Sequence, residues 1–525
     1  MNEPAKPPIS KRSELMRCFH WLFSWRGIRR LLIVLAWSAT LIALWYGVEN
    51  WRGRGAWKKY RQELEARGEQ LDLKSFIPRP VADEQNFAAT PVVQSWFTKK
   101  SRLTLDDDFS RIEPLVPKPI AKTNGATRRF VDLVAWERAF AAVRSGKLEK
   151  HPTIEPGKLD SESRAKAAPS VLDAFKADED IFTELRNASS RPYCRYPVNY
   201  DLENPWGILI PHLQPLKALF PRLRVKACAE LAAGQSAKAL EDMNLMFYLA
   251  DSVKDEPFLI SFLVRLACVN IAVQPLWEGL AEHRWSEAQL QELQTRFQKY
   301  DFVSDAKLPL RSERATGILT VDLIREKGLG ILVALDDSPP RSSRRFWNLI
   351  GSFVPRGWYD QEQLNYCRLY QQQLTGIFDV SAKSISPTQI KSGSHELEHE
   401  IGGGKLGRDF AAIVHHHVVA ALLLPSLDKS VRKAAEAQTV ANHAALACAL
   451  ERYRLANGQF PDRLEALAPQ FMPQLPNDVL TGEPYKYRRT ADAGFLLYSI
   501  GWDEKDDGGV PGKYLYDETS GDWVW

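Results

Sequence analysis

The sequence is poor in cysteine, and its cysteines are not arranged as a metal site. No Cys-x-x-Cys pair occurs among the six, which are Cys18, Cys194, Cys228, Cys268, Cys367 and Cys448. Several lie inside apolar helical stretches such as LVRLACVNIA and HAALACALERY. We therefore interpret them as small buried hydrophobic residues rather than as a disulfide framework or a zinc site.

The sequence also lacks a strong excess of either charge, because its formal net charge is only +4 over 525 residues. It has no nucleic-acid-binding signature, so we expect no nucleic-acid partner. P-loops, Rossmann glycine fingerprints and nucleophilic triads are absent as well. The length exceeds that of one ordinary domain, and we expect two or three folding units.

An uncharged apolar run extends from Leu31 to Val48. Its 18 residues are close to the minimum that crosses about 30 Å of hydrocarbon. Aromatic residues crowd both of its ends, as in an interfacial belt: Trp21, Trp25, Trp45, Tyr46, Trp51, Trp57 and Tyr60. We predict a single-pass transmembrane helix at 31–48. A cleaved signal peptide is the competing interpretation, but WYGVENW offers no small-x-small cleavage site.

The orientation of this helix depends on the basic residues around it. Seven precede the apolar run and six follow it, so their numbers are nearly equal. Arg29 and Arg30 adjoin the run, and a long C-terminal region can be translocated whatever its charge. We predict a cytoplasmic tail at 1–30, an uncleaved anchor in a bacterial inner membrane, and the C-terminal bulk in the periplasm.

The sequence after the anchor is mainly helical. Residues 49–205 predict a juxtamembrane helix and then an irregular, proline-punctuated region. In the predicted helical domain at 206–430, ELAAGQSAKALEDMNLMFYLA is similar to a single tetratricopeptide-type hairpin. Ser286 and Gln289 have capping-box spacing. The wide apolar faces of these helices predict an all-α bundle or short solenoid. We interpret the apolar run Phe410–Pro425 as a buried helix, too short for a second membrane crossing.

Residues 431–525 have the pattern of a small α+β module. A long helix is expected to end at Asn457-Gly458, a C-capping pair. Asp462 and Glu465 are spaced to cap a short second helix. EPYKYRR and GFLLYSI alternate as two strands around ADAG, which predicts a hairpin. The expected fold class is therefore predominantly α, with an N-terminal transmembrane helix, a helical domain and this module.

The module resembles the C-terminal globular domain of type II secretion major pseudopilins. The resemblance covers roughly the last 95 residues and follows ALERYRLANGQFP, the Leu464/Leu467 helix, PNDVLTGEPYKYR and GFLLYSIGWDEKDDGG in order. It implies an envelope interaction module. In that family the membrane helix directly precedes the domain and carries a glutamate. Here the apolar run ends at Val48 and contains no acidic residue. The whole chain is similar to bacterial membrane-anchored envelope proteins with a pseudopilin-like tail.

One segment matches an enzyme motif, since His395-Glu396-Leu397-Glu398-His399 fits H-E-x-x-H. In zinc peptidases the two histidines bind zinc one helical turn apart, and the glutamate activates the metal-bound water. The histidines at 415–417 are candidates for a third ligand. The surrounding sequence, KSGSHELEHEIGGGKLG, is polar and glycine-rich, whereas such a helix normally lies in apolar sequence. We interpret the motif as an exposed charged helix turn and do not expect zinc.

A second candidate metal site is the acidic loop GWDEKDDGG. Asp503, Asp506 and Asp507 offer hard oxygen ligands, and Gly508-Gly509 would let the loop wrap around calcium. Members of the pseudopilin family hold calcium in this loop, which the resemblance implies here. The competing interpretation is a solvated acidic turn, because the order of EF-hand ligands is absent.

These features together predict a non-enzymatic, membrane-anchored envelope scaffold with protein partners and no required cofactor. The resemblance implies a setting in secretion or surface assembly. Two alternatives stay open. One is a membrane-tethered zinc metallopeptidase with His395, Glu396 and His399 as catalytic residues, and the other is a calcium-dependent binding module.

Overall fold

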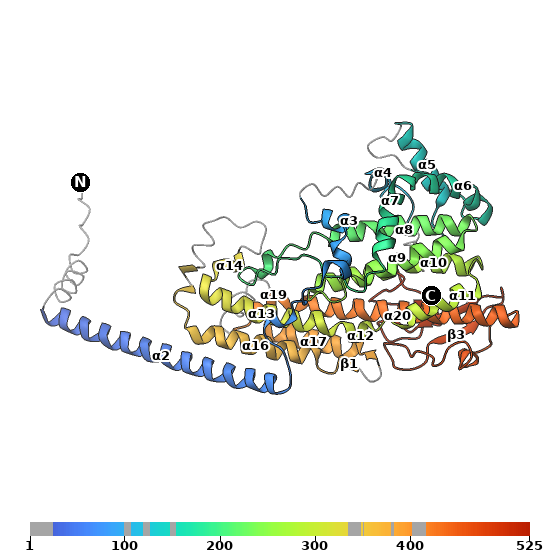
Figure 1. Ribbon diagram of the computed structural model, residues 1–525. Helices are drawn as coiled ribbons and strands as arrows, with labels where there is room; N and C mark the ends of the chain where they lie inside the picture. Colours follow the sequence, from blue (N-terminus) through green and yellow to red (C-terminus); the bar gives the residue numbers. More distant parts are fainter. Residues whose placement is uncertain are drawn as a thin grey trace, which may run out of the picture. The chain divides into compact units, whose positions relative to one another are not determined.

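The computed structural model describes residues 25–98, 107–118, 127–146, 154–333, 348–349, 351–379, 383–401 and 416–525. The chain is predominantly helical, as the sequence predicted, and carries an apolar helix near its N-terminus (Figure 1). It divides into two compact units. The first comprises Met1–Glu69, Val321–Tyr366 and Val414–His417, and the second comprises Gln70–Thr320, Cys367–Ile413 and Val418–Trp525.

The first unit contains the longest helix of the described chain, α2, at Trp25–Ala66. The predicted apolar helix at 31–48 is therefore present. Residues 49–66, expected as a separate juxtamembrane helix, continue it without a break because no proline interrupts them. This unit also holds α14 (Gly330–Val333), the end of α13 (Lys307–Lys327) and the start of α16 (Arg356–Leu374).

Two glycines let α2 and α16 meet backbone to backbone. A Cβ atom on Gly53 would overlap the backbone of Gly357, and one on Gly357 would overlap the backbone around Asn50. The Asn50 Oδ1 atom accepts a hydrogen bond of 2.7 Å from the backbone N–H of Gly357. Trp45 packs edge-to-face on Trp358 nearby, with ring centroids 5.9 Å apart. The C-terminal half of α2 is thus fastened within its own unit.

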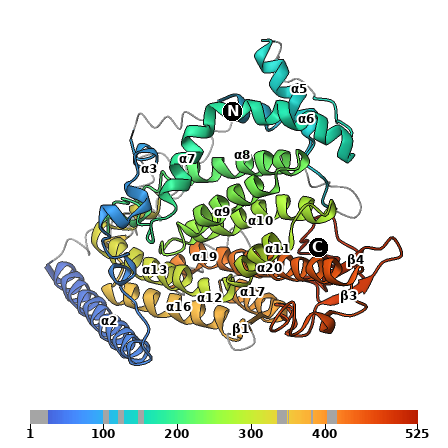
Figure 2. The same ribbon diagram turned by 45° about the vertical axis from the view of Figure 1, so that its right-hand side comes forward.

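The second unit holds most of the helices (Figure 2). They are α3 (Pro91–Ser95), α4 (Asp107–Ile112), α5 (Leu133–Arg144), α6 (Ser161–Ala174), α7 (Glu179–Ala188), α8 (Leu213–Ala232), α9 (Ser236–Asp251), α10 (Leu259–Ala281), α11 (Glu287–Gln298), α12 (Phe302–Asp305), α17 (Pro387–Ile401), α19 (Val418–Leu423) and α20 (Pro425–Asn457). Short 3-10 turns lie at Leu73–Phe76, Asp83–Gln85, Phe87–Ala89, Lys176–Asp178, Pro205–Gly207 and Leu464–Leu467.

The core of the second unit is a stack of helices in which α8, α9 and α10 pack on one another and α10 and α11 pack on α20 (Figures 1 and 2). Like α2, helix α10 is long and apolar enough to cross a membrane, but 61% of its apolar window is buried in the unit. The predicted capping box at Ser286 and Gln289 is confirmed at the start of α11. Cys228, Cys268, Cys367 and Cys448 are buried and free, as expected; Cys194 is free but only half-buried, and Cys18 lies outside the described residues.

Helix α20 leads into a three-stranded antiparallel sheet in the order β3-β4-β5. The strands are β3 (Lys486–Arg489), β4 (Phe495–Ser499) and β5 (Trp523–Val524), and a separate pair joins β1 (Phe378–Asp379) to β2 (Ser384–Ile385). The predicted hairpin is confirmed, because Tyr487 pairs with Leu497. Gly458 ends α20 in the left-handed conformation with φ +79°, as its C-capping role requires.

One expectation for this region was wrong in detail, and one predicted boundary falls inside a helix. Asp462 does not cap the helical turn Leu464–Leu467, because its carboxylate binds Arg489 at 2.9 Å instead. The predicted domain boundary at 430/431 lies inside α20, which begins at Pro425, a favoured first residue of a helix. The described part of the apolar run Phe410–Pro425 forms the six-residue α19 and enters α20, and Val419, Ala420 and Leu423 are buried there.

Candidate functional site

The H-E-x-x-H motif lies on helix α17. This helix turns Ile390 and Leu397 inward and leaves His395, Glu396 and His399 exposed. The Glu396 carboxylate accepts a hydrogen bond of 2.7 Å from Gln372 Nε2. Among the residues that the structure describes, no group of three or more His, Cys, Asp or Glu side chains is placed to hold a metal ion. His415, one candidate for a third ligand, lies outside those residues. The motif therefore stands on an open helix face.

In the acidic loop, Asp503 and Asp506 accept hydrogen bonds from groups of the same region, and the backbone N–H of Asp507 donates to Asp522. Asp503 Oδ1 accepts from the Lys505 N–H at 3.2 Å. Asp506 Oδ1 accepts from the Gly508 N–H at 3.0 Å and from the Tyr498 hydroxyl at 3.1 Å. The Gly508 hydrogen bond lowers the pKa of Asp506. The Asp503 and Asp506 carboxylates thus stabilise turns of this loop.

Asp522 closes the acidic loop, and sequence analysis did not identify it. Its carboxylate is buried and accepts hydrogen bonds from the backbone N–H of Asp507 (3.3 Å) and Gly509 (2.6 Å). Burial raises the pKa of Asp522, the two backbone hydrogen bonds lower it, and the neighbouring charges of Asp506 and Asp507 add to the rise. A buried carboxylate next to two exposed ones makes Asp522 the structural centre of the loop.

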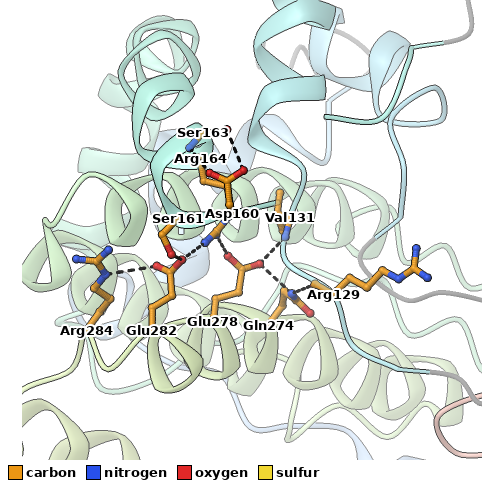
Figure 3. A network of polar contacts seen from close by, with 10 residues as sticks. All are labelled: Arg129, Val131, Asp160, Ser161, Ser163, Arg164, Gln274, Glu278, Glu282 and Arg284. Carbon is orange, nitrogen blue, oxygen red and sulfur yellow. Dashed lines mark hydrogen bonds and ion pairs between the residues drawn. The ribbon is translucent and has the colours of Figure 1, made fainter. Parts of the chain in front are cut away.

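A buried charge network joins α6 to α10 (Figure 3). Arg164 has no exposed surface, and its guanidinium binds both Glu278 and Glu282, with 2.7 Å between Nη1 and Glu282 Oε1. Glu278 also accepts hydrogen bonds from the Val131 N–H (2.6 Å) and Gln274 Nε2 (2.9 Å). Burial raises the pKa of Glu278, and Arg164 is the largest influence that opposes the rise. Because these groups bind one another, the network is structural.

A second buried network lies between α8 and α9. Lys226 Nζ binds Glu230 at 2.6 Å and Asp242 at 2.8 Å, and Asp242 also binds Arg186 at 2.9 Å. Burial, followed by the charge of Asp242, raises the pKa of Glu230 to about 8, and Lys226 opposes the rise. Two close carboxylates could suggest acid–base chemistry. Here both carboxylates bind the Lys226 ammonium, so this network also holds helices together.

A cavity of about 970 Å³ lies in the second unit. We call it the basic cavity, because basic side chains line it together with fewer acidic ones. The basic residues are Lys118, Arg128, Arg224, Arg432, Lys433 and Lys513, and the acidic ones are Glu436, Asp517 and Glu518. Helices α8, α10 and α20 and the loop 513–520 contribute to the lining. Its volume lies at the upper end of small-molecule sites, about 300–1,000 Å³.

Sequence analysis missed the basic cavity because its residues come from segments that are far apart along the chain. One local signal was present. Helix α8 is apolar over most of its length and yet carries Arg222, Arg224 and Lys226 within five positions. Charged residues inside an apolar helix are costly to bury, so they indicate partners or a ligand.

No protein-family model, no curated protein and no solved structure matches this chain.

Proposed function

We propose that this chain is a non-enzymatic, membrane-anchored interaction protein of the bacterial envelope, with α2 as its single span and its C-terminal bulk in the periplasm. The observation that carries the proposal is that no residue in the apolar window of α2 is buried. Leu32, Leu41 and Leu44 are each about 60% exposed. Exposing apolar surface to water costs about 25 cal/mol per Å², so a bilayer is the surrounding that stabilises this helix.

The contrast with α10 supports this assignment. Both helices are long and apolar enough to span a bilayer, but α10 buries most of its apolar window against α8, α9 and α20. Packing in its own unit already removes that surface from water. Of these two described helices, α2 is therefore the one that needs a membrane.

The interaction role rests on the rest of the chain. The networks around Arg164 and Lys226 are absorbed in helix packing, and the H-E-x-x-H residues lie exposed on α17. The sheet β3-β4-β5 and the acidic loop after α20 are consistent with the resemblance to pseudopilins, in which such a module takes part in envelope assembly. We infer that the module engages other envelope proteins.

The anchor is tested with the full chain in cells, by alkaline extraction of membranes. Leu35→Arg with Leu41→Arg should release the chain, because each arginine at the centre of a membrane helix costs about 2.5–3.5 kcal/mol. Lys58→Gln, in the same helix but outside the apolar run, should stay in the membrane. A C-terminal alkaline phosphatase fusion should be active if the bulk is periplasmic. An extractable wild type or an inactive fusion contradicts the respective part of the proposal.

The interaction role is tested by cross-linking in intact cells. We expect discrete hetero-oligomeric products that contain the full chain, and no peptide hydrolysis by the purified protein. Peptide hydrolysis that disappears in Glu396→Gln, together with zinc that disappears in His399→Ala, would refute the non-enzymatic role and establish the metallopeptidase alternative.

A further inference from the structure

The basic cavity contains more positive charge than its own carboxylates neutralise. Glu436 binds Lys433 at 2.5 Å, and Glu518 forms an ion pair with Arg432. Asp517 is buried and accepts hydrogen bonds from Thr519 N–H (2.9 Å) and the Thr519 hydroxyl (2.7 Å). Each of the three acidic side chains of the lining therefore already has a partner within the chain. The remaining cations of the lining are Lys118, Arg128, Arg224 and Lys513.

Arg224 lacks the close carboxylates that two other arginines of the second unit have. Arg186 and Arg265 each have two carboxylates within 3 Å, which is how a buried guanidinium is normally neutralised. Arg224 is only 14% exposed, and its ion-pair contact among the described residues is Glu113 at 4.0 Å. Glu113 also lies 3.9 Å from Lys118, so one remote carboxylate serves two cations. The Nε atom of Arg224 is buried without a hydrogen-bond partner in the described chain.

Arg128 is held in the cavity by neutral groups. Its Nη2 atom donates to the Tyr516 hydroxyl at 3.1 Å, and its guanidinium lies 5.7 Å from the centre of the Trp525 ring. No carboxylate lies within ion-pair distance of it among the described residues, and its Nε atom is buried without a hydrogen-bond partner there. The fully buried His443 stays neutral beside it, because burial, and then the charge of Arg128, lower the pKa of His443 to about 3.

The cations and the shape of the cavity together indicate its ligand class. Arginine forks bind phosphate oxygens through paired hydrogen bonds, and a dianion balances two arginines that lack close carboxylates. A cavity of about 970 Å³ is far larger than a phosphate ion, so it has room for an organic group beside Tyr514. We propose that the basic cavity binds a small organic phosphate ester, with its phosphate on Arg128 and Arg224.

This ligand chemistry has two sources, a soluble metabolite and a phospholipid headgroup. The full chain in phosphatidylcholine nanodiscs is titrated by calorimetry with glycerol 3-phosphate and, separately, with short-chain dihexanoyl phosphatidate. Glycerol is the uncharged control. Saturable binding of either phosphate ester, without binding of glycerol, supports the proposal. The ester that binds more tightly identifies the source of the ligand.

Substitutions place the binding in the cavity. Arg224→Gln and Arg128→Gln should each weaken binding by about 10–100-fold, the usual effect of losing a hydrogen bond to a charged group. Arg463→Gln removes the same charge from an exposed position outside the cavity and should leave the affinity unchanged. If a buried arginine variant does not fold, Lys513→Gln at the exposed rim provides the test and should weaken binding as well.

Two results would overturn the proposal: no saturation with either ester up to millimolar concentrations, or equal weakening by Arg463→Gln. The result is independent of the function proposed above. Membrane extraction and cross-linking report the anchor and the partners, and neither requires a ligand in this cavity.

Discussion

Removing the Arg164 side chain should be one of the most damaging single changes in the second unit. Arg164 and Glu278 have 0% and 1% of their side chains exposed, so neither charge is solvated by water. Arg164→Met keeps much of the apolar length but leaves the Glu278 carboxylate without a cation, with the Val131 N–H, Gln274 and the weak Cys228 thiol as donors (Figure 3). Breaking a buried ion pair by removing one partner costs about 3–5 kcal/mol of unfolding free energy.

The cost should depend on pH in a defined direction. Burial already raises the pKa of Glu278 above its usual 4.5, and Arg164 is the main influence that lowers it. Without Arg164 the folded-state pKa rises further, so the folded state holds a proton that the unfolded state releases. In the variant, stability is therefore greatest below about pH 4.5 and falls as pH rises toward the new pKa. The variant should be relatively more damaged at pH 8.5 than at pH 6.

A double variant and a matched control make the test decisive. Arg164→Met with Glu278→Gln removes both charges and should recover at least half of the lost stability, since replacing a whole buried pair is often nearly neutral. Lys166→Met removes a cation from the same helix, where Lys166 and Glu162 are 75% and 79% exposed. It should change stability by less than about 1 kcal/mol.

The assay is urea denaturation of the full chain in detergent, followed by tryptophan fluorescence, with hydrogen exchange of α5 and α6 as the local readout. The reasoning is refuted if Arg164→Met costs no more than Lys166→Met. It is also refuted if the double variant is no more stable than the single one.

Three further predictions follow from other parts of the chain. Gly53→Leu should cost about 1–3 kcal/mol and increase hydrogen exchange at the start of α16, because its side chain would overlap Gly357, whereas Gly55→Leu, with open space at its Cβ, should not. His443 has a folded pKa of about 3, below the usual 6.5, so its stability contribution is complete above pH 6.5 and is lost as pH falls toward 3. The free energy of unfolding from urea titrations should fall between pH 7 and pH 5 by about 2 kcal/mol more in the wild type than in His443→Phe; an equal fall would contradict this. Zinc content of the purified full chain should be far below one ion per chain and unaffected by His399→Ala, because that side chain lies exposed on α17; stoichiometric zinc in the wild type that His399→Ala abolishes would refute it.

Several features were predictable from the sequence because they depend on interactions between near neighbours. The apolar run at 31–48 requires only uninterrupted hydrophobic residues, and it lies in α2. Ser286 caps α11 through Gln289, three residues away, and Gly458 ends α20 through its own left-handed backbone. The hairpin of β3 and β4 follows from alternation around a short turn.

Only the tertiary structure decided the features whose partners lie far apart along the chain. Arg164 and Glu278 are 114 positions apart, and no periodicity pairs them. Asp462, which had cap spacing, binds Arg489 because the hairpin brings that guanidinium within 2.9 Å. The basic cavity likewise brings Arg128, Arg224 and the loop 513–520 together. Local spacing determined where helices and turns begin and end, whereas the solvation of each buried charge depends on long-range packing, and so the candidate ligand site does as well.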